Sequence, residues 1–175
     1  MRIIAISGSL RAESMNARVL HACAAVAPPG IEVLVYEKIG ELPHFNPDLD
    51  FEGAPAPPPV AELRALVDGA QGLLISTPEY AHGVPGTLKN ALDWLVSTDV
   101  LGAKPIVLLN ASASGGGHAL AALTETLRTM GADVLTQASL LTPFLKKKLV
   151  GPDVDPEVAA ALGPPLDALA TYRRL

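Results

Sequence analysis

The chain has 175 residues, of which 49% are hydrophobic and 18% are charged, and its formal net charge is −5. That length and composition predict one folded domain over residues 1–175 and exclude an intrinsically disordered chain. A negative chain without a basic stripe is not expected to bind nucleic acid, and the short basic run at 146–148 is predicted to be a solvated surface patch.

The only cysteine, Cys23, has the spacing from Val19 and Val26 that places it on the buried face of a helix. A core thiol is therefore predicted rather than a nucleophile. A single cysteine excludes an internal disulfide and a multi-cysteine metal site. The sequence shows no export leader and no apolar run of membrane-spanning length. We expect a cytoplasmic protein with neither a membrane nor a metal as its partner.

Short apolar runs alternate with stretches of helical periodicity along the chain. In chain order, the pattern predicts a strand at 2–7, a helix at 15–27, a strand at 31–36, a helix at 59–69, a strand at 72–76, a helix at 85–97, a strand at 105–110, a helix at 116–130, a strand at 132–141 and a helix at 156–173. The proline pair Pro164–Pro165 is expected to bend or break the last helix. The connection at 37–59 is long, and such loops are usually functional or mobile.

This alternation predicts an α/β, flavodoxin-like three-layer sandwich, with a five-stranded parallel sheet of order 2-1-3-4-5 and helices on both faces. In such sheets a ligand binds beyond the carboxyl ends of the strands, where the strand order reverses. The loops after the first, third and fourth strands are therefore the candidate ligand site.

The loop after the first strand, "GSLRAESMN", combines hydroxyl residues, an amide and one arginine at the start of a helix. Backbone amides at a helix N-terminus favour an anion, and a guanidinium forms paired hydrogen bonds with phosphate oxygens. The sequence predicts a phosphate-monoester site made by Ser7, Ser9, Arg11, Ser14 and Asn16. The alternative is a capped helix start, with Ser14 as the N-cap and the other side chains in solvent.

The loop after the third strand carries Tyr80, one of few aromatic residues in the chain, between the polar residues Glu79 and His82. The alternative is that Tyr80 covers the edge of the core and Glu79 is a surface charge. The loop after the fourth strand contains three consecutive glycines, which allow a flat ligand to approach the backbone. A phosphate site, an aromatic loop and a glycine loop on one sheet edge suit riboflavin phosphate.

The stretches "GSLRAESMNARVL" and "TPEYAHGVPGTLKNALDWL" together resemble the NADPH-dependent FMN reductase family, which includes quinone, chromate and azo-dye reductases of flavodoxin-like fold. The resemblance covers roughly residues 1 to 130 and implies non-covalent FMN, with NADPH or NADH as the electron donor. It also implies a homodimer or homotetramer that passes two electrons to a small acceptor such as a quinone, a flavin, chromate or an azo compound.

Matching the family's motifs implies which residues bind FMN. The implied residues are Ser9, Arg11, Ser14, Met15 and Asn16 around the phosphate, Pro78, Glu79, Tyr80, Ala81 and His82 beside the flavin ring, and Ser112, Gly115, Gly116 and Gly117 at its pyrimidine side. Two positions depart from the family pattern. Ala81 replaces the usual asparagine, for which His82 is expected to compensate, and His118 with apolar neighbours replaces an arginine and a glutamine.

Because the flavin carries the chemistry, no catalytic acid–base residue is expected. The competing hypothesis is a non-catalytic flavin- or nucleotide-binding regulatory module, favoured by the departures at Ala81 and His118. An electron-carrier flavodoxin is less favoured because the phosphate loop lacks that family's run of threonines. The sequence also lacks the G-x-S-x-G motif of hydrolases.

Overall fold

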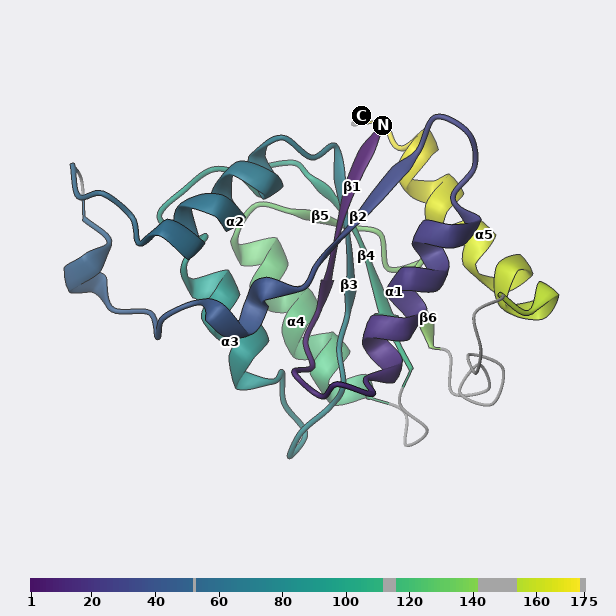
Figure 1. Cartoon of the computed structure of the whole chain (residues 1–175), viewed down its shortest axis with the longest axis horizontal. Coiled ribbons are helices and arrows are strands. Elements are labelled where there is room, and N and C mark those ends of the chain that lie inside the picture. Colours follow the sequence, from purple (N-terminus) through teal and green to yellow (C-terminus); the bar gives the residue numbers. More distant parts are fainter. Residues whose placement is uncertain (52, 112–115, 142–153, 174–175) are drawn as a thin grey trace.

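The computed structural model describes residues 1–51, 53–111, 116–141 and 154–173, in which strands and helices alternate (Figure 1). The strands are β1 (Arg2–Ser7), β2 (Glu32–Tyr36), β3 (Gly72–Ser76), β4 (Pro105–Asn110), β5 (Asp133–Val134) and β6 (Leu140–Leu141). The helices are α1 (Met15–Val26), α2 (Pro58–Asp68), α3 (Gly86–Asp93), α4 (Gly117–Thr129) and α5 (Pro156–Thr171). Most of these elements begin and end within one or two residues of their predicted limits.

The strands form one parallel sheet of order β2-β1-β3-β4-β5, which confirms the predicted topology. In the register of β1 and β3, Ser7 lies opposite Ser76. The carboxyl ends of these two central strands are therefore level. This places the loops after β1 and β3 side by side at one edge of the sheet, where the strand order reverses.

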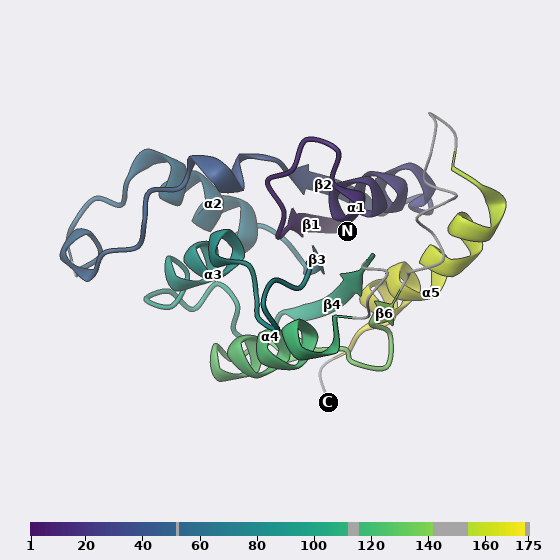
Figure 2. The same ribbon diagram turned by 90° about the horizontal axis from the view of Figure 1, so that it is seen from below.

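Helices cover both faces of the sheet, with α1 and α5 on one face and α2, α3 and α4 on the other (Figure 2). Alternate residues of a strand point to opposite faces. Accordingly, Ile3 and Ala5 pack with α1 and α5, whereas Ile4 and Ile6 pack with the other three helices. Cys23 is fully buried in the first of these layers, as predicted. Burial on both faces explains why the strand sequences are continuously apolar.

The predicted strand at 132–141 is wrong as a single element, because the structure has two short strands, β5 and β6, that both pair with β4. Between them the chain turns through hydrogen bonds from the Ala138 and Ser139 amides to the Leu135 carbonyl, 3.0 and 3.1 Å long. The Ser139 hydroxyl accepts a 3.1 Å hydrogen bond from the Leu108 amide. A side chain thus replaces the strand carbonyl that β4 would otherwise use.

Two helix ends also differ from the prediction. Helix α3 ends at Asp93 rather than at residue 97, and the following turns have tighter bonds, such as the 2.9 Å bond from the Leu95 amide to the Leu92 carbonyl. Helix α5 continues through Pro164–Pro165 as one element, so of the two expected effects, a bend or a break, the break is wrong. Its buried residues Leu162 and Leu166 pack against the sheet on both sides of the prolines, and this packing compensates for the lost backbone bonds.

The connection between β2 and α2 contains two short 3-10 helices, η1 (Lys38–Glu41) and η2 (Pro47–Leu49), and extends far from the sheet (Figure 1). We refer to residues 42–51 of this connection as the arm. Its first part contacts α3, because the Asn90 side chain accepts from the Phe45 amide at 2.7 Å and donates to the Pro43 carbonyl at 3.0 Å. The indole of Trp94 also donates to the Pro43 carbonyl, at 2.8 Å, and packs edge-to-face on Phe45.

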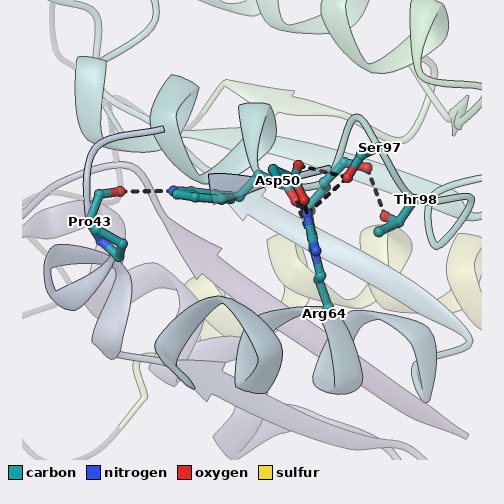
Figure 3. Close-up of polar contacts among 7 residues, drawn as sticks. Pro43, Asp50, Arg64, Ser97 and Thr98 are labelled. Carbon is teal, nitrogen blue, oxygen red and sulfur yellow. Dashed lines mark hydrogen bonds and ion pairs between the residues drawn. The ribbon is translucent and has the colours of Figure 1, made fainter. Parts of the chain in front are cut away.

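The end of the arm is bound by Arg64 of α2 (Figure 3). The guanidinium donates to Asp50 at 2.8 Å, to Ser97 at 2.9 Å and twice to the Trp94 carbonyl, at 2.9 and 2.6 Å. The Ser97 hydroxyl completes the network by donating to Asp50 at 2.7 Å. Arg64 therefore satisfies a carbonyl at the C-terminus of α3 and anchors the arm at the same time.

Candidate functional site

The loop after β1 is ordered by its own hydroxyl groups. The Ser7 hydroxyl accepts from the Ser9 amide at 3.2 Å, and the Ser9 hydroxyl accepts from the Arg11 amide at 3.3 Å. Ser14 is the N-cap of α1, and its hydroxyl accepts from the Ala17 amide at 3.3 Å. The capping role considered for Ser14 is thus present, and these hydrogen bonds shape the loop.

Arg11 is the charged group of this loop. Its side chain is exposed, and within the described part of the chain its guanidinium makes no hydrogen bond or ion pair. A pocket of about 240 Å³ lies between the loop and the end of β2, bordered by Ser9, Arg11, Tyr36 and Ile39 among others. The Arg11 side chain is therefore available to a ligand, next to the first turn of α1.

Met15 and Asn16 lie closer to the protein interior. Met15 packs against the core layer under α1. The side-chain oxygen of buried Asn16 accepts from the Ser76 hydroxyl at 2.9 Å and from the Ala111 amide at 3.4 Å. Asn16 therefore connects the start of α1 to the carboxyl ends of β3 and β4 and holds the starts of the three candidate loops next to one another.

The loops after β1 and β3 are in direct contact. The Gly8 amide donates to the Ser76 carbonyl at 2.8 Å, and a Cβ at Gly8 would lie 2.8 Å from the Thr77 hydroxyl oxygen. Glycine is required here because of this close approach. Ser76, Thr77 and Asn110 are buried polar residues at the strand ends that the sequence analysis missed. In the sequence, such residues could have been recognised as polar residues that directly follow a continuous apolar run.

The loop after β3 forms a tight turn that presents Tyr80. The backbones of Tyr80 and Gly83 exchange two hydrogen bonds, 3.2 and 2.9 Å long, and Ala81 and His82 between them have φ angles of +49° and +58°. This is a two-residue hairpin turn with both central residues left-handed, which costs roughly 1–2 kcal/mol for each residue with a Cβ. The Tyr80 ring is 57% exposed, so it does not cover the core edge.

Pro78 and Glu79 connect β3 to this turn. The Pro78 carbonyl accepts from the Thr77 hydroxyl at 3.0 Å. The Glu79 carboxylate accepts a 2.9 Å hydrogen bond from the Ala119 amide in the first turn of α4. Glu79 is thus not a free surface charge, because it stabilises the N-terminus of α4 and fixes the distance between two of the candidate loops.

The described part of the glycine loop is Gly116 and Gly117, whereas Ser112 and Gly115 lie outside the described residues. Gly116 precedes α4 with a φ angle of +93°, and a Cβ there would lie 2.0 Å from the side-chain nitrogen of Asn110. Glycine is therefore required for both backbone conformation and space. Gly117 is exposed at the start of α4.

The two histidines of these loops are in contact. The rings of His82 and His118 lie with their centroids 4.3 Å apart and their planes 16° from parallel. Both residues are exposed. This contact joins the turn after β3 to the first turn of α4, next to the Glu79 hydrogen bond.

Two groups, one on α1 and one on β2, have pKa values shifted by burial. Burial raises the pKa of the Cys23 thiol to about 12, so Cys23 is not a thiolate nucleophile. Burial, with the charges of Glu62 and Glu41, raises the pKa of Tyr36 to about 12. Among the described residues no cluster of three metal-ligating side chains occurs, and none of the described helices has the length and apolarity needed to cross a membrane.

The chain is similar to characterised flavin reductases over most of its length. A model of the NADPH-dependent FMN reductase family matches residues 1–145. A quinone reductase of Escherichia coli is 30% identical over 167 residues, which cover 93% of this chain and 85% of that protein. An NAD(P)H-dependent FMN reductase of Pseudomonas aeruginosa is 36% identical over 123 residues, which cover 69% of this chain and 65% of that protein.

A solved structure gives the same fold. FerB, a flavoenzyme NAD(P)H:(acceptor) oxidoreductase from Paracoccus denitrificans, is 24% identical, has a TM-score of 0.76 and covers 96% of this chain and 94% of its own. The match confirms the flavodoxin-like fold. The family and the relatives also confirm the predicted oxidoreductase class, with FMN and a nicotinamide donor as its cofactors. They favour the enzyme over the competing hypothesis of a non-catalytic regulatory module. Because the family match spans more than half of the chain, this protein belongs to the NADPH-dependent FMN reductase family.

Proposed function

We propose that this protein is a cytoplasmic NAD(P)H-dependent quinone reductase that binds FMN at the three loops beyond β1, β3 and β4. The observation that carries this proposal is the exposed Arg11 guanidinium, without a protein partner among the described residues, beside the capped start of α1. A quinone is proposed as the acceptor because the Escherichia coli relative, which is matched over 93% of this chain, is a quinone reductase.

The residues fit the chemistry of FMN. Arg11 supplies a cation with paired donors, and the first turn of α1 supplies backbone amides, as a phosphate monoester requires. Tyr80 supplies an exposed aromatic face. Gly117 is exposed and has open space where a Cβ would lie, so the first residue of α4 allows close approach of a flat ring system.

When bound, FMN would supply the redox chemistry of two-electron transfer from the nicotinamide donor to an acceptor. The protein's residues have binding and orienting roles. Arg11 and Ser9 bind the phosphate, Tyr80 limits one side of the ring site, and the backbone amides at the start of α4 stabilise negative charge on the bound ring. The net reaction converts NAD(P)H, a proton and a quinone to NAD(P)⁺ and a hydroquinone.

A visible absorption spectrum of the protein, recorded after incubation with FMN and desalting, tests the cofactor. A retained flavin band, followed by NADPH or NADH oxidation that depends on added quinone, is the expected result. A colourless protein that fails to oxidise either nucleotide in the presence of FMN and quinone would contradict the proposal. Turnover with chromate or an azo dye but not with quinone would contradict the choice of acceptor.

The protein is also proposed to form a homodimer or homotetramer. Support comes from three exposed apolar side chains, Leu49 and Phe51 at the end of the arm and Val96 after α3. They are neighbours in sequence of Asp50 and Ser97, which are hydrogen-bonded to each other at 2.7 Å. Light scattering of the purified protein measures the assembly, and a monomer at micromolar concentration would contradict this part of the proposal.

A further inference from the structure

The turn that presents Tyr80 has a conformation that its own sequence does not favour. Two-residue turns with both central residues left-handed are typically formed by Asn-Gly, because these residues tolerate positive φ angles. Here the central residues are Ala81 and His82, with φ angles of +49° and +58°. An interaction outside the turn must therefore favour this conformation over a relaxed one with negative φ angles.

The His82–His118 stack is positioned to provide that interaction. With a φ angle of +58° at His82, the His82 ring lies nearly parallel to the His118 ring of α4, at a centroid distance of 4.3 Å. The start of α4 is itself fixed, because Gly116 packs on Asn110 and the Ala119 amide donates to Glu79 at 2.9 Å. His118 is thus a rigid support for a side chain that belongs to the strained turn.

The conformation of the 80–83 turn also determines where the Tyr80 ring lies. Tyr80 both donates to and accepts from the backbone of Gly83, so the direction of its Cα–Cβ bond follows from the geometry of this turn. The ring itself is exposed, and burial in the core does not orient it. A change of φ at Ala81 or His82 would break these backbone bonds and redirect the ring.

We propose that His118, through its stack on His82, is a positioning residue that keeps the 80–83 turn left-handed and so holds Tyr80 in place at the flavin site. The role of the stack in the turn is independent of the ligand, whereas its effect on FMN rests on the proposed function. The stack offers no metal site in the described structure, because no third ligand joins the two imidazoles.

The first experiment uses the protein without FMN. NMR-detected hydrogen exchange at the Gly83 amide, which donates to the Tyr80 carbonyl at 2.9 Å, measures opening of the turn. We expect His118→Ala to accelerate this exchange about fivefold, in line with the usual strength of an aromatic pair. His118→Phe keeps a planar ring and is expected to remain within about twofold of the wild type.

Rescue separates positioning from direct ligand contact. Asparagine adopts left-handed conformations more readily than alanine, so Ala81→Asn should restore slow Gly83 exchange in the His118→Ala background. The FMN dissociation constant, measured by quenching of flavin fluorescence, should rise about fivefold in His118→Ala and return to within about twofold in the double variant. His44→Ala is the matched control, because His44 is an exposed histidine of the arm.

The two measurements have distinguishable outcomes. Unchanged Gly83 exchange in His118→Ala would overturn the proposal, and so would a His118→Phe variant that behaves like His118→Ala. Weaker FMN binding with unchanged exchange would assign His118 to direct ligand contact and also overturn it. If the wild type fails to bind FMN, the proposed function fails, but the exchange rates still decide whether the stack holds the turn.

Discussion

The side chain of Arg64 extends from α2 to the arm and is 18% exposed, whereas Arg11 lies in an exposed loop at the carboxyl edge of the sheet. Arg64 donates to Asp50, Ser97 and the Trp94 carbonyl, and the Asp50 side chain is only 8% exposed. Arg11 has no such protein partners among the described residues. The same residue type is thus used to stabilise the fold in one region and is left available for a ligand in the other.

The contacts of a charged group therefore indicate its role better than its position in a sequence motif does. A largely buried guanidinium that is hydrogen-bonded to the protein contributes to folding, and its removal leaves a partner carboxylate without its compensating charge. An exposed guanidinium beside a helix N-terminus contributes little to stability. Substitutions at the two arginines should therefore separate stability from cofactor affinity.

The largest expected effect is on stability. Arg64→Met retains much of the side-chain volume but removes the hydrogen bonds that Arg64 donates to Asp50, Ser97 and Trp94. We expect the free energy of unfolding, measured by urea denaturation, to fall by about 3 kcal/mol, because a nearly buried carboxylate loses its charged partner. FMN affinity per folded molecule should stay within about twofold of the wild type. A large loss of FMN affinity without a loss of stability would contradict the comparison.

The next effect is on cofactor affinity. Arg11→Ala should weaken FMN binding by about 2 kcal/mol, or about 30-fold in the dissociation constant, because a charged hydrogen bond to phosphate is lost. The free energy of unfolding should change by less than about 0.5 kcal/mol. Arg11→Lys is the control, since it keeps the charge but not the paired donors, and an intermediate affinity is expected. Unchanged affinity for FMN in Arg11→Ala would remove the basis for the phosphate site.

A smaller effect depends on pH. Burial opposes ionisation of Asp50, but hydrogen bonds from Arg64 and Ser97 and the Arg64 charge outweigh it and hold the pKa of this carboxyl below its usual value. A carboxyl whose folded pKa is lowered contributes stability above its unfolded pKa of about 4, and that stability is lost as the pH falls through the folded pKa. Asp50→Asn should thus lower the free energy of unfolding by about 1.5 kcal/mol at pH 7.

The pH series provides the control for this prediction. The difference between the wild type and Asp50→Asn, measured by urea denaturation, should shrink below about pH 4 as Asp50 of the wild type takes up a proton. A difference that stays constant from pH 7 to pH 3 would show that the Asp50 charge does not stabilise the arm. Arg64→Met serves as the reference variant for the pH series, because it already lacks the ion pair between Asp50 and Arg64.

Much of the fold follows from local patterns in the sequence. The apolar strand at 72–76 and the helix at 116–130 were predictable because strand burial and helical periodicity depend on adjacent residues. The division of 132–141 into β5 and β6 was not, because it depends on the Ser139 hydroxyl meeting the distant Leu108 amide. The continuation of α5 through Pro164 depends likewise on packing against the sheet.

The candidate site divides in the same way. The helix start after the first loop and its Ser14 cap could be predicted from residue types, whereas anion binding by the hydroxyls and Arg11 stays a prediction. The hydrogen bond from Ala119 to Glu79 and the His82–His118 stack could not, since each joins residues about 40 positions apart along the chain. No spacing rule connects two loops that meet only after the sheet forms.

The sequence by itself determined the parallel α/β architecture, the sheet edge at which a ligand is proposed to bind and the family to which the chain belongs, because these depend on periodicity, on residue type and on motifs within single loops. Only the tertiary structure decided that Arg64 stabilises the arm while Arg11 remains available, and that a strained turn is supported from α4. The physical reason is that hydrogen bonds and ring contacts act over a few ångströms in space, and which residues come that close is a property of the folded chain.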